Sequence, residues 1–236
     1  MTKACIIGAG KRGKRLEKRL PAYGTKKIDL INSFEKIIDV SIYDKVIICV
    51  PTYCLLEVLK RVQRGNKKKI VISCIKWLMK NGETVCTYLD KHLKKQIKWK
   101  SFFLGGANID DEKEIIEIKR DKKLELACVL KNTYAIGFGI ALQQGENYAA
   151  HELTKYLNEY KKLWIKENYR ADLLVCCFSD KSRNKIFWQN FTKGKKSTSL
   201  IKEKTIEWLY TAQVIEKQNL FKGCKELRKI TKTITK

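Results

Sequence analysis

The sequence predicts an α/β protein in which an N-terminal parallel-sheet domain precedes a mainly α-helical C-terminal domain. Its first half alternates short apolar runs with amphipathic segments, and these runs lack polar alternation. Uninterrupted apolar strands are typical of a parallel sheet that is covered on both faces. From residue 124 onward, apolar residues recur every three or four positions, as in helices. We place the boundary in the charged stretch 119–123, which gives domains 1–122 and 123–236.

The first half reads as repeated strand and helix units in β-α-β order. Strands are expected at 4–7, 28–31, 46–50, 70–73, 101–104 and 114–118. Helices are expected at 14–20 and 55–62, and Pro51 ends the run before the second helix. Helical spacing in the second half starts with Ala127, Leu130 and Tyr134. Both prolines precede residue 52, so no proline ring interrupts these later helices.

The chain is strongly basic, with 50 Lys and Arg against 25 Asp and Glu, which gives a formal charge of +25 over 236 residues. Such a charge attracts phosphates, nucleic acid, anionic lipid or acidic metabolites without choosing among them. The basic residues are scattered and do not form one arm or stripe. A solvated basic surface is therefore favoured, and nucleic-acid binding remains an alternative that is not favoured.

Cysteine and histidine usage predicts a reduced protein without a metal site. The nine cysteines are dispersed without a C-x-x-C motif, and no signal peptide precedes them, which indicates the cytoplasm. Neither His92 nor His151 has a neighbour at zinc-ligand spacing. The longest uncharged stretch, 132–145, is too short to cross a bilayer, so no membrane span is expected.

A glycine-rich turn follows the first apolar run and opens an amphipathic segment. Gly8, Gly10 and Gly13 form G-x-G-x-x-G, with Lys11 and Arg12 between the last two glycines. After a strand and before a helix, this pattern cradles a dinucleotide pyrophosphate, as in Rossmann-type domains. The first glycine permits the turn, the second lets the backbone approach the phosphates, and the third lets helix and strand pack closely.

Two alternatives accompany this interpretation. The residues from Gly8 to Lys14 also satisfy G-x-x-x-x-G-K, but Arg15 stands where a P-loop needs Ser or Thr to hold magnesium. Asp29 is the candidate acid for the ribose hydroxyls, although it lies inside the second strand. Because Lys11 and Arg12 would accommodate a 2′-phosphate, the choice between NAD and NADP stays open.

The second half contains residues suited to a small phosphorylated substrate. They are Lys131 with Asn132, Asp172, and Ser182-Arg183-Asn184. Lys131 lies in an almost uncharged helical stretch, so it is either a solvated helical lysine or a partly desolvated one. Desolvation and cations such as Lys76 or Arg183 would lower its pKa and make it a usable general acid or base.

The order of these segments is similar to that of the glycerol-3-phosphate dehydrogenase family. The matching segments are GAGKRG (8–13), DKVIICVP (44–51), SCIKW (73–77), LGGANIDDE (104–112), LKN (130–132), ADLLVCCFSDKSRN (171–184) and IEW (206–208). They run through most of the chain. The most specific part of the resemblance is LKN (130–132), followed by DL (172–173) and then by SRN (182–184), about fifty residues after LKN.

This resemblance implies a reaction and a role for each residue. The reaction would be interconversion of dihydroxyacetone phosphate and glycerol 3-phosphate with NAD or NADP, which supplies phospholipid synthesis, by a homodimer. Lys131 would be the proton donor and acceptor, and Asp172 would orient it or bind a substrate hydroxyl. Arg183 would hold the phosphate, an anion that suits its planar fork of donors. The resemblance assigns Lys76, Gly106, Asn108, Ser182 and Asn184 to the substrate site, and Lys76, Arg183 and Glu207 to the cofactor.

The chain also departs from the family pattern. Gly106-Ala107-Asn108 stands where the family has Gly-Pro-Ser, Asp110 replaces a small residue, and Trp208 replaces a glycine, which would crowd a ligand. The chain is shorter between Gly13 and Asp44 than most members. Two alternatives follow, namely a dehydrogenase of another phosphorylated ketone or hydroxy acid, and a pseudoenzyme that binds nucleic acid or another anionic partner.

Overall fold

The computed structural model describes residues 2–23, 28–63, 65, 69–93, 100–105, 117–180, 182, 184, 187–188 and 206–235. The chain forms two compact units. The first unit contains Met1–Lys76, Val85–Leu104 and Ile118–Asp121. The second contains Trp77–Thr84, Gly105–Glu117 and Lys122–Lys236. Each unit is described by itself below.

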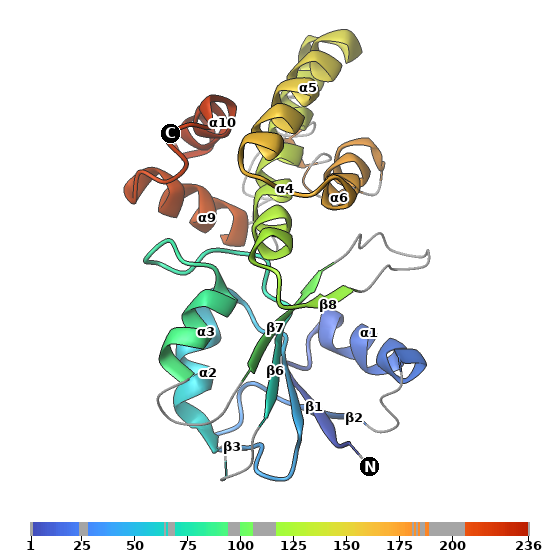
Figure 1. Cartoon of the computed structure of the whole chain (residues 1–236), viewed down its shortest axis with the longest axis vertical. Coiled ribbons are helices and arrows are strands. Elements are labelled where there is room, and N and C mark those ends of the chain that lie inside the picture. Colours follow the sequence, from blue (N-terminus) through green and yellow to red (C-terminus); the bar gives the residue numbers. More distant parts are fainter. Residues whose placement is uncertain are drawn as a thin grey trace. The chain divides into compact units, whose positions relative to one another are not determined.

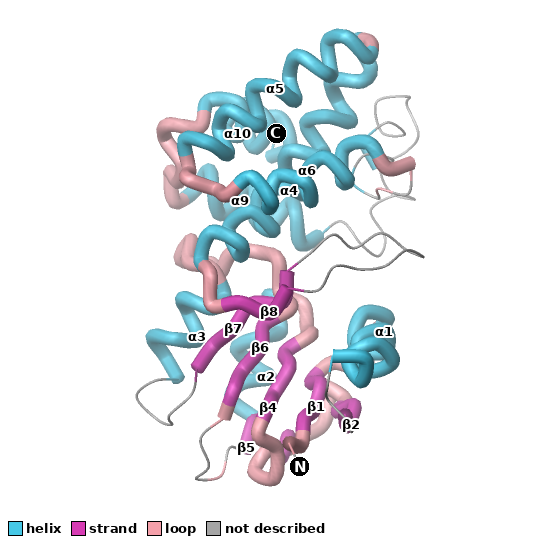
Figure 2. The backbone as a smooth tube through the Cα atoms, turned by 45° about the vertical axis from the view of Figure 1, so that its right-hand side comes forward, coloured by secondary structure: helices cyan, strands magenta, loops and turns pink. Residues whose placement is uncertain are grey.

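A six-stranded sheet forms the centre of the first unit (Figures 1 and 2). Its strand order is β2-β1-β4-β6-β7-β8. The strands are β1 (Ala4–Ile7), β2 (Ile28–Ile31), β4 (Lys45–Ile48), β6 (Ile70–Ser73), β7 (Lys100–Gly105) and β8 (Glu117–Lys119). The pairs from β2 through β7 are parallel. The α/β class predicted from uninterrupted apolar strands is thus confirmed.

Helices lie on both faces of this sheet, with α1 on one face and α2 and α3 on the other (Figure 1). They span Lys11–Arg19 (α1), Leu55–Arg61 (α2) and Val85–Leu93 (α3). Strand β1 is completely buried, as expected for a central strand with helices on both faces of its sheet. Strand β2 lies on one side of β1, and the later strands β4, β6 and β7 follow one another on its other side. The strand order therefore reverses at β1, which is the switch point of the sheet. Ligands of such sheets bind beyond the carboxyl ends of the strands at that point.

Two short elements of the first unit were not expected. The two-residue strands β3 (Ile38–Asp39) and β5 (Val62–Gln63) pair in parallel apart from the main sheet.

Lys69 is the last of three consecutive lysines, yet it has only 1% of its surface exposed. Its ammonium donates to the carbonyl oxygens of Ser41 at 3.0 Å and Tyr43 at 2.6 Å. The side chain therefore ties two loops together and is not part of the basic surface.

The second unit is helical, as expected. Its described helices are α4 (Lys122–Ala141), α5 (Glu146–Lys162), α6 (Glu167–Phe178), α9 (Ile206–Lys217) and α10 (Lys225–Thr235). Helix α4 is central and contacts each of the other four, and α9 packs on α10 (Figure 2). One segment of the described residues, Lys122–Gln144, is long and apolar enough to span a membrane, but 83% of its 18-residue apolar window is buried inside the protein. That burial is typical of a core helix.

A buried carboxylate fixes the start of α10. Glu159 accepts hydrogen bonds from the backbone N–H groups of Glu226 at 2.8 Å and Leu227 at 3.0 Å, and from the Tyr134 hydroxyl at 2.7 Å. The first amides of a helix have no partner within it, and an anion there is also favoured by the helix dipole. Glu159 therefore joins α4, α5 and α10 into one core.

Candidate active site

The glycine-rich turn connects β1 to α1 at the switch point of the sheet. Gly8 has a φ of +120°, which side-chain-bearing residues rarely adopt, and a Cβ there would lie 2.3 Å from the Cys49 carbonyl oxygen. A Cβ at Gly13 would lie 1.9 Å from the carbonyl oxygen of Gly8. Both positions therefore need glycine, one for the turn and one for the close packing of helix on strand.

Gly10 differs from the other two glycines because a Cβ built there meets nothing within 4 Å. Internal packing therefore does not require glycine at this position. Gly10 is the N-cap of α1, it provides no side-chain cap, and the first turn of the helix carries no acidic residue. Free amides and the positive end of the helix dipole favour an anion at such a terminus. The open space at Gly10 thus fits a phosphate that approaches the backbone.

Two of the cations predicted for the cofactor lie near the end of β6. Both Arg12 and Lys76 act electrostatically on Cys74, which follows that strand. The pKa of the Cys74 thiol is raised because it hydrogen-bonds with Cys49 and is buried, and the two cations oppose this shift. Lys76 is 6% exposed, and one Arg12 nitrogen, Nη2, is buried without a hydrogen-bond partner among the described residues. Lys11 is exposed.

Asp29 does not occupy a ribose-binding position. It pairs with Cys5 inside the sheet, two residues before β2 ends at Ile31. Its Oδ2 accepts a hydrogen bond of 2.8 Å from the Tyr43 hydroxyl. The residue that follows β2 is Asn32. The acid considered from its spacing therefore has a structural role, and the carboxyl end of β2 is followed by an amide side chain.

In the second unit, Lys131 of α4 and Asp172 of α6 form a buried ion pair. The Lys131 ammonium lies 2.5 Å from Oδ1 and 2.6 Å from Oδ2 of Asp172, so it donates to both carboxylate oxygens. Lys131 is 4% exposed and Asp172 8% exposed. A buried pair of this kind needs good geometry to offset the loss of hydration. The structure thus brings together the two residues that the sequence suggested as catalytic.

The direction of the Lys131 pKa shift is opposite to the one expected from the sequence. Burial by itself lowers the pKa of this ammonium, but Cys176, Asp172 and Cys128 raise it, and the net shift is upward from its ordinary value. The expectation of a lowered pKa was wrong because Cys176, Asp172 and Cys128 together outweigh desolvation. Lys131 is therefore a protonated ammonium at neutral pH, and it holds its proton more tightly than an exposed lysine does.

Sequence reasoning missed the two cysteines beside this pair. The Cys128 thiol donates to Asp172 Oδ2 at 3.6 Å, and Cys176 acts electrostatically on Lys131. Helical spacing could have identified both, because Cys128 precedes Lys131 by three residues and Cys176 follows Asp172 by four. Each cysteine thus lies one helical turn from one member of the pair.

The SRN segment is connected to α4 by a side-chain hydrogen bond. The Asn184 amide donates to Asn132 Oδ1 at 3.0 Å. Ser182 is half-buried, and its backbone N–H donates to the Ser179 carbonyl oxygen at 3.0 Å. Two predicted substrate residues therefore lie in or near the helices that carry the ion pair.

Some predicted site residues lie outside the described part of the chain. These are Gly106, Asn108 and Arg183. For Glu207 the structure describes the backbone, within α9, but not the side chain. The neighbouring Trp208 is buried and packs against Phe187 and Trp188, with ring centroids 5.6 and 5.9 Å apart. The ring is thus part of an aromatic core cluster.

Two comparisons of sequence place the chain among known proteins. The family model described as NAD-dependent glycerol-3-phosphate dehydrogenase C-terminus matches residues 122–236. Glycerol-3-phosphate dehydrogenase [NAD(P)+] from the Gardel and the Welgevonden strains of Ehrlichia ruminantium is 32% identical over an alignment of 92 residues. That alignment covers 33% of this chain and 28% of each relative. The chain thus matches less than a third of the length of these curated relatives.

A comparison of structures extends over almost the whole chain. The crystal structure of glycerol-3-phosphate dehydrogenase from Coxiella burnetii matches with a TM-score of 0.75 and 16% sequence identity. The match covers 99% of this chain and 94% of that one. At this identity, the likeness shows that the two chains share a fold.

Proposed function

Residues 122–236 belong to the C-terminal domain family of NAD-dependent glycerol-3-phosphate dehydrogenases, and on this premise we propose that the chain interconverts dihydroxyacetone phosphate and sn-glycerol 3-phosphate. The observation that carries the proposal is the buried Lys131–Asp172 pair, because it lies within the matched domain and holds a protonated ammonium that can serve as the proton donor. The reaction also needs a dinucleotide site, which we assign to the glycine-rich turn of the first unit.

The cofactor is NAD or NADP, as the family name implies. Gly8, Gly10 and Gly13 would shape the turn that receives the pyrophosphate, with Lys11, Arg12 and Lys76 as its cations. The open space at Gly10 and the buried Arg12 nitrogen without a partner among the described residues fit such an anion. When bound, the nicotinamide ring exchanges a hydride with the substrate carbon. The proposal extends to Glu207 as a further cofactor contact.

Lys131 carries the proton in this reaction. In the direction of reduction, its ammonium gives a proton to the carbonyl oxygen of the substrate while that carbon gains a hydride. In oxidation, the neutral amine takes the hydroxyl proton back. Asp172 holds the amine in place through two hydrogen bonds and keeps it protonated before the reaction. Cys128, which donates to Asp172, fixes the orientation of that carboxylate.

The substrate phosphate is assigned to Arg183, on the family resemblance. A guanidinium donates two parallel hydrogen bonds to a phosphate, and a lysine binds it only as a point charge. Asn184, which is hydrogen-bonded to Asn132, and Ser182 are proposed as further donors. Lys76, Gly106 and Asn108 complete the proposed set.

The phosphate assignment is tested with dihydroxyacetone, which lacks the phosphate. We expect kcat/KM for this analogue to be at least about 100-fold below that for dihydroxyacetone phosphate, because a site built for a charged group rejects a ligand without it. Steady-state rates with both ketones measure this ratio. Equal rates would remove Arg183 from the phosphate role and would favour another substrate.

The pH dependence follows from the raised pKa of Lys131. Between pH 7 and 9 the side chain stays protonated, so reduction should show no loss attributable to it. Oxidation needs the neutral amine and should rise about tenfold per pH unit over the same range. In Asp172→Asn, burial without the carboxylate lowers the lysine pKa, so the rise in oxidation should shift to lower pH. A plateau in oxidation below pH 8 in the unsubstituted chain would contradict the assignment.

The setting of the reaction is part of the same proposal. All nine cysteines lie in the described residues and none forms a disulfide, which supports a reducing compartment such as the cytoplasm. We further propose that the chain acts as a homodimer and that its product supplies phospholipid synthesis.

A further inference from the structure

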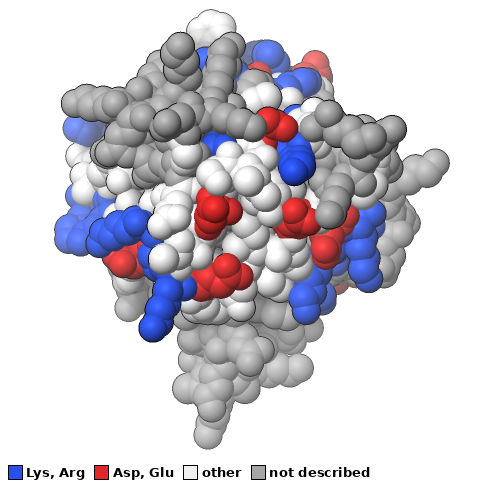
Figure 3. Space-filling view, turned by 90° about the horizontal axis from the view of Figure 1, so that it is seen from below, with Lys and Arg blue, Asp and Glu red and all other residues white. Residues whose placement is uncertain are grey.

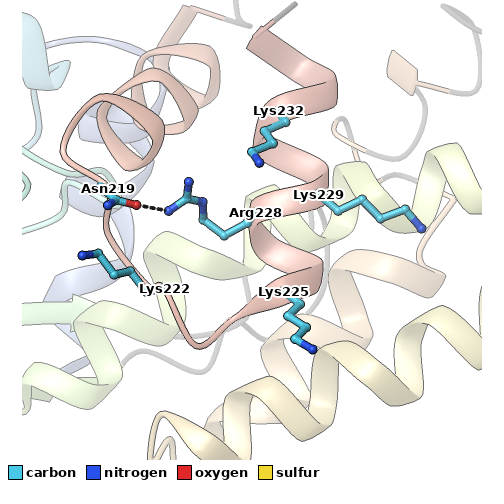
Figure 4. Close-up of a pocket in the computed structure, with 6 residues that line it drawn as sticks. All are labelled: Asn219, Lys222, Lys225, Arg228, Lys229 and Lys232. Carbon is cyan, nitrogen blue, oxygen red and sulfur yellow. Dashed lines mark hydrogen bonds between the residues drawn. The ribbon is translucent and has the colours of Figure 1, made fainter.

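A groove lined almost entirely by cations lies on the second unit, along α10 and the turn before it (Figure 4). Its volume is about 590 Å³. The lining residues, here called the basic groove, are Asn219, Lys222, Lys225, Arg228, Lys229 and Lys232. None of these residues has a role in the reaction proposed above.

Four of the cations share one face of α10. Lys225, Arg228, Lys229 and Lys232 follow a spacing of three, four and seven residues, which places them side by side on a helix. The opposite face, with Leu227 and Ile230 among its residues, is buried in the helical unit. Like charges at this spacing repel one another, so a bound anion would relieve a cost that the helix carries.

The arginine of the groove is held in position. Arg228 donates from Nη1 to Asn219 Oδ1 at 2.5 Å (Figure 4). Its Nε lies 3.3 Å from Glu216 Oε1. Lys229 lies 4.0 Å from Glu152. Within the described ranges of the chain, Lys222, Lys225 and Lys232 form no ion pair. The groove therefore combines one oriented guanidinium with three lysines that can bind an anion.

The lining defines the chemistry of the ligand. It contains no aromatic residue on which a base could stack, and its volume is that of a small-molecule site. The row from Lys225 to Lys232 is about 10 Å long at 1.5 Å per residue, which is short for a nucleic-acid strand. The apolar face of α10 is buried and cannot insert into a membrane. A compact anion with several linked phosphates matches these features.

We propose that the basic groove binds a compact polyphosphate, of which inorganic tripolyphosphate is the simplest example. Several linked phosphates would contact three or more of the lysines together with Arg228, whereas a single phosphate would reach only one or two. The face drawn in Figure 3 shows acidic side chains among the basic ones, so the +25 charge does not give every surface this character. The site is independent of the proposed dehydrogenase reaction.

Isothermal titration of the full chain with tripolyphosphate tests the proposal. In the triple variant Lys225→Gln, Lys229→Gln, Lys232→Gln we expect the dissociation constant to rise at least about tenfold, because each lost contact with a charged group weakens binding. The matched control removes three exposed lysines elsewhere, as Lys18→Gln, Lys36→Gln, Lys161→Gln, and should change it less than about twofold. Circular dichroism and thermal unfolding verify that both variants are folded.

Further titrations test where tripolyphosphate binds and whether its binding is specific. They compare the basic groove with the dinucleotide turn, with diffuse electrostatic attraction to the whole surface, and with binding of a larger polyanion. Gly10→Ala, which alters the dinucleotide turn, should leave unchanged the component of tripolyphosphate binding that the groove variant removes. Orthophosphate should bind the basic groove more weakly than tripolyphosphate. The charge reversals Lys225→Glu and Lys232→Glu, made singly, should each weaken binding. Equal losses in the two triple variants would overturn the proposal in favour of diffuse attraction. It would also be overturned if single-stranded RNA or anionic lipid vesicles bound the groove more tightly than tripolyphosphate.

Discussion

Replacing Lys131 by Ala is expected to reduce the rate of dihydroxyacetone phosphate reduction about 100- to 10,000-fold, the range that general acid–base catalysis contributes. The loss should appear in kcat, and dinucleotide binding by the first unit should be unchanged. Steady-state kinetics and a fluorescence titration with NADH or NADPH measure the two quantities. Lys122→Ala is the matched control, because Lys122 is an exposed lysine on the same helix.

A second variant separates chemistry from stability. Lys131→Ala leaves the buried Asp172 carboxylate without its partner, which costs about 3–5 kcal/mol in comparable cases. Lys131→Arg keeps a cation beside Asp172, but its larger, planar guanidinium cannot place a proton where the lysine ammonium places it. We expect this variant to fold and to be as inactive as the Ala variant. Near-normal turnover in either variant would show that Lys131 is not the proton donor.

The glycines of the dinucleotide turn are expected to respond in opposite ways to alanine. Gly13→Ala places a Cβ where the Gly8 carbonyl oxygen lies, so helix and strand must separate. Overpacking of this kind costs about 1–3 kcal/mol or more. Gly10→Ala meets nothing within 4 Å, so its stability should equal that of the unsubstituted chain. Its affinity for the dinucleotide should nevertheless fall at least about tenfold, because the methyl group occupies the space of the phosphate.

Urea unfolding and dinucleotide titration of both variants test this pair. The interpretation predicts that Gly13→Ala loses stability and that Gly10→Ala loses affinity alone. If Gly10→Ala bound NADH and NADPH as tightly as the unsubstituted chain, the turn would have only a structural role.

The sequence predicted those strands in which burial requires an apolar residue at almost every position. Strands β1 and β6 coincide with the apolar runs from which they were predicted, because a strand covered on both faces accepts little else. The edge strand β2 also coincides with its predicted run, although it is half-buried and contains Asp29. The strands β3 and β5 are too short to show a period. Helix α3 (Val85–Leu93) was also missed, and its sequence VCTYLDKHL mixes β-branched, aromatic and charged residues.

The candidate site was predictable by residue type but not by its electrostatics. Lys131 and Asp172 are 41 residues apart in sequence, and only the packing of α4 on α6 shows that their charged atoms touch. That contact reverses the expected shift of the Lys131 pKa. The role of Asp29 depended in the same way on tertiary structure, since its carboxylate is engaged by Tyr43.

The central claim is tested most directly by following the absorbance of NADH, and separately of NADPH, when the purified chain is mixed with dihydroxyacetone phosphate. We predict a loss of absorbance with at least one of the two cofactors that depends on the ketone, is abolished in Lys131→Arg and identifies the preferred cofactor. Unchanged absorbance with both cofactors, in a sample whose folding is verified by circular dichroism, would contradict the proposed dehydrogenase reaction.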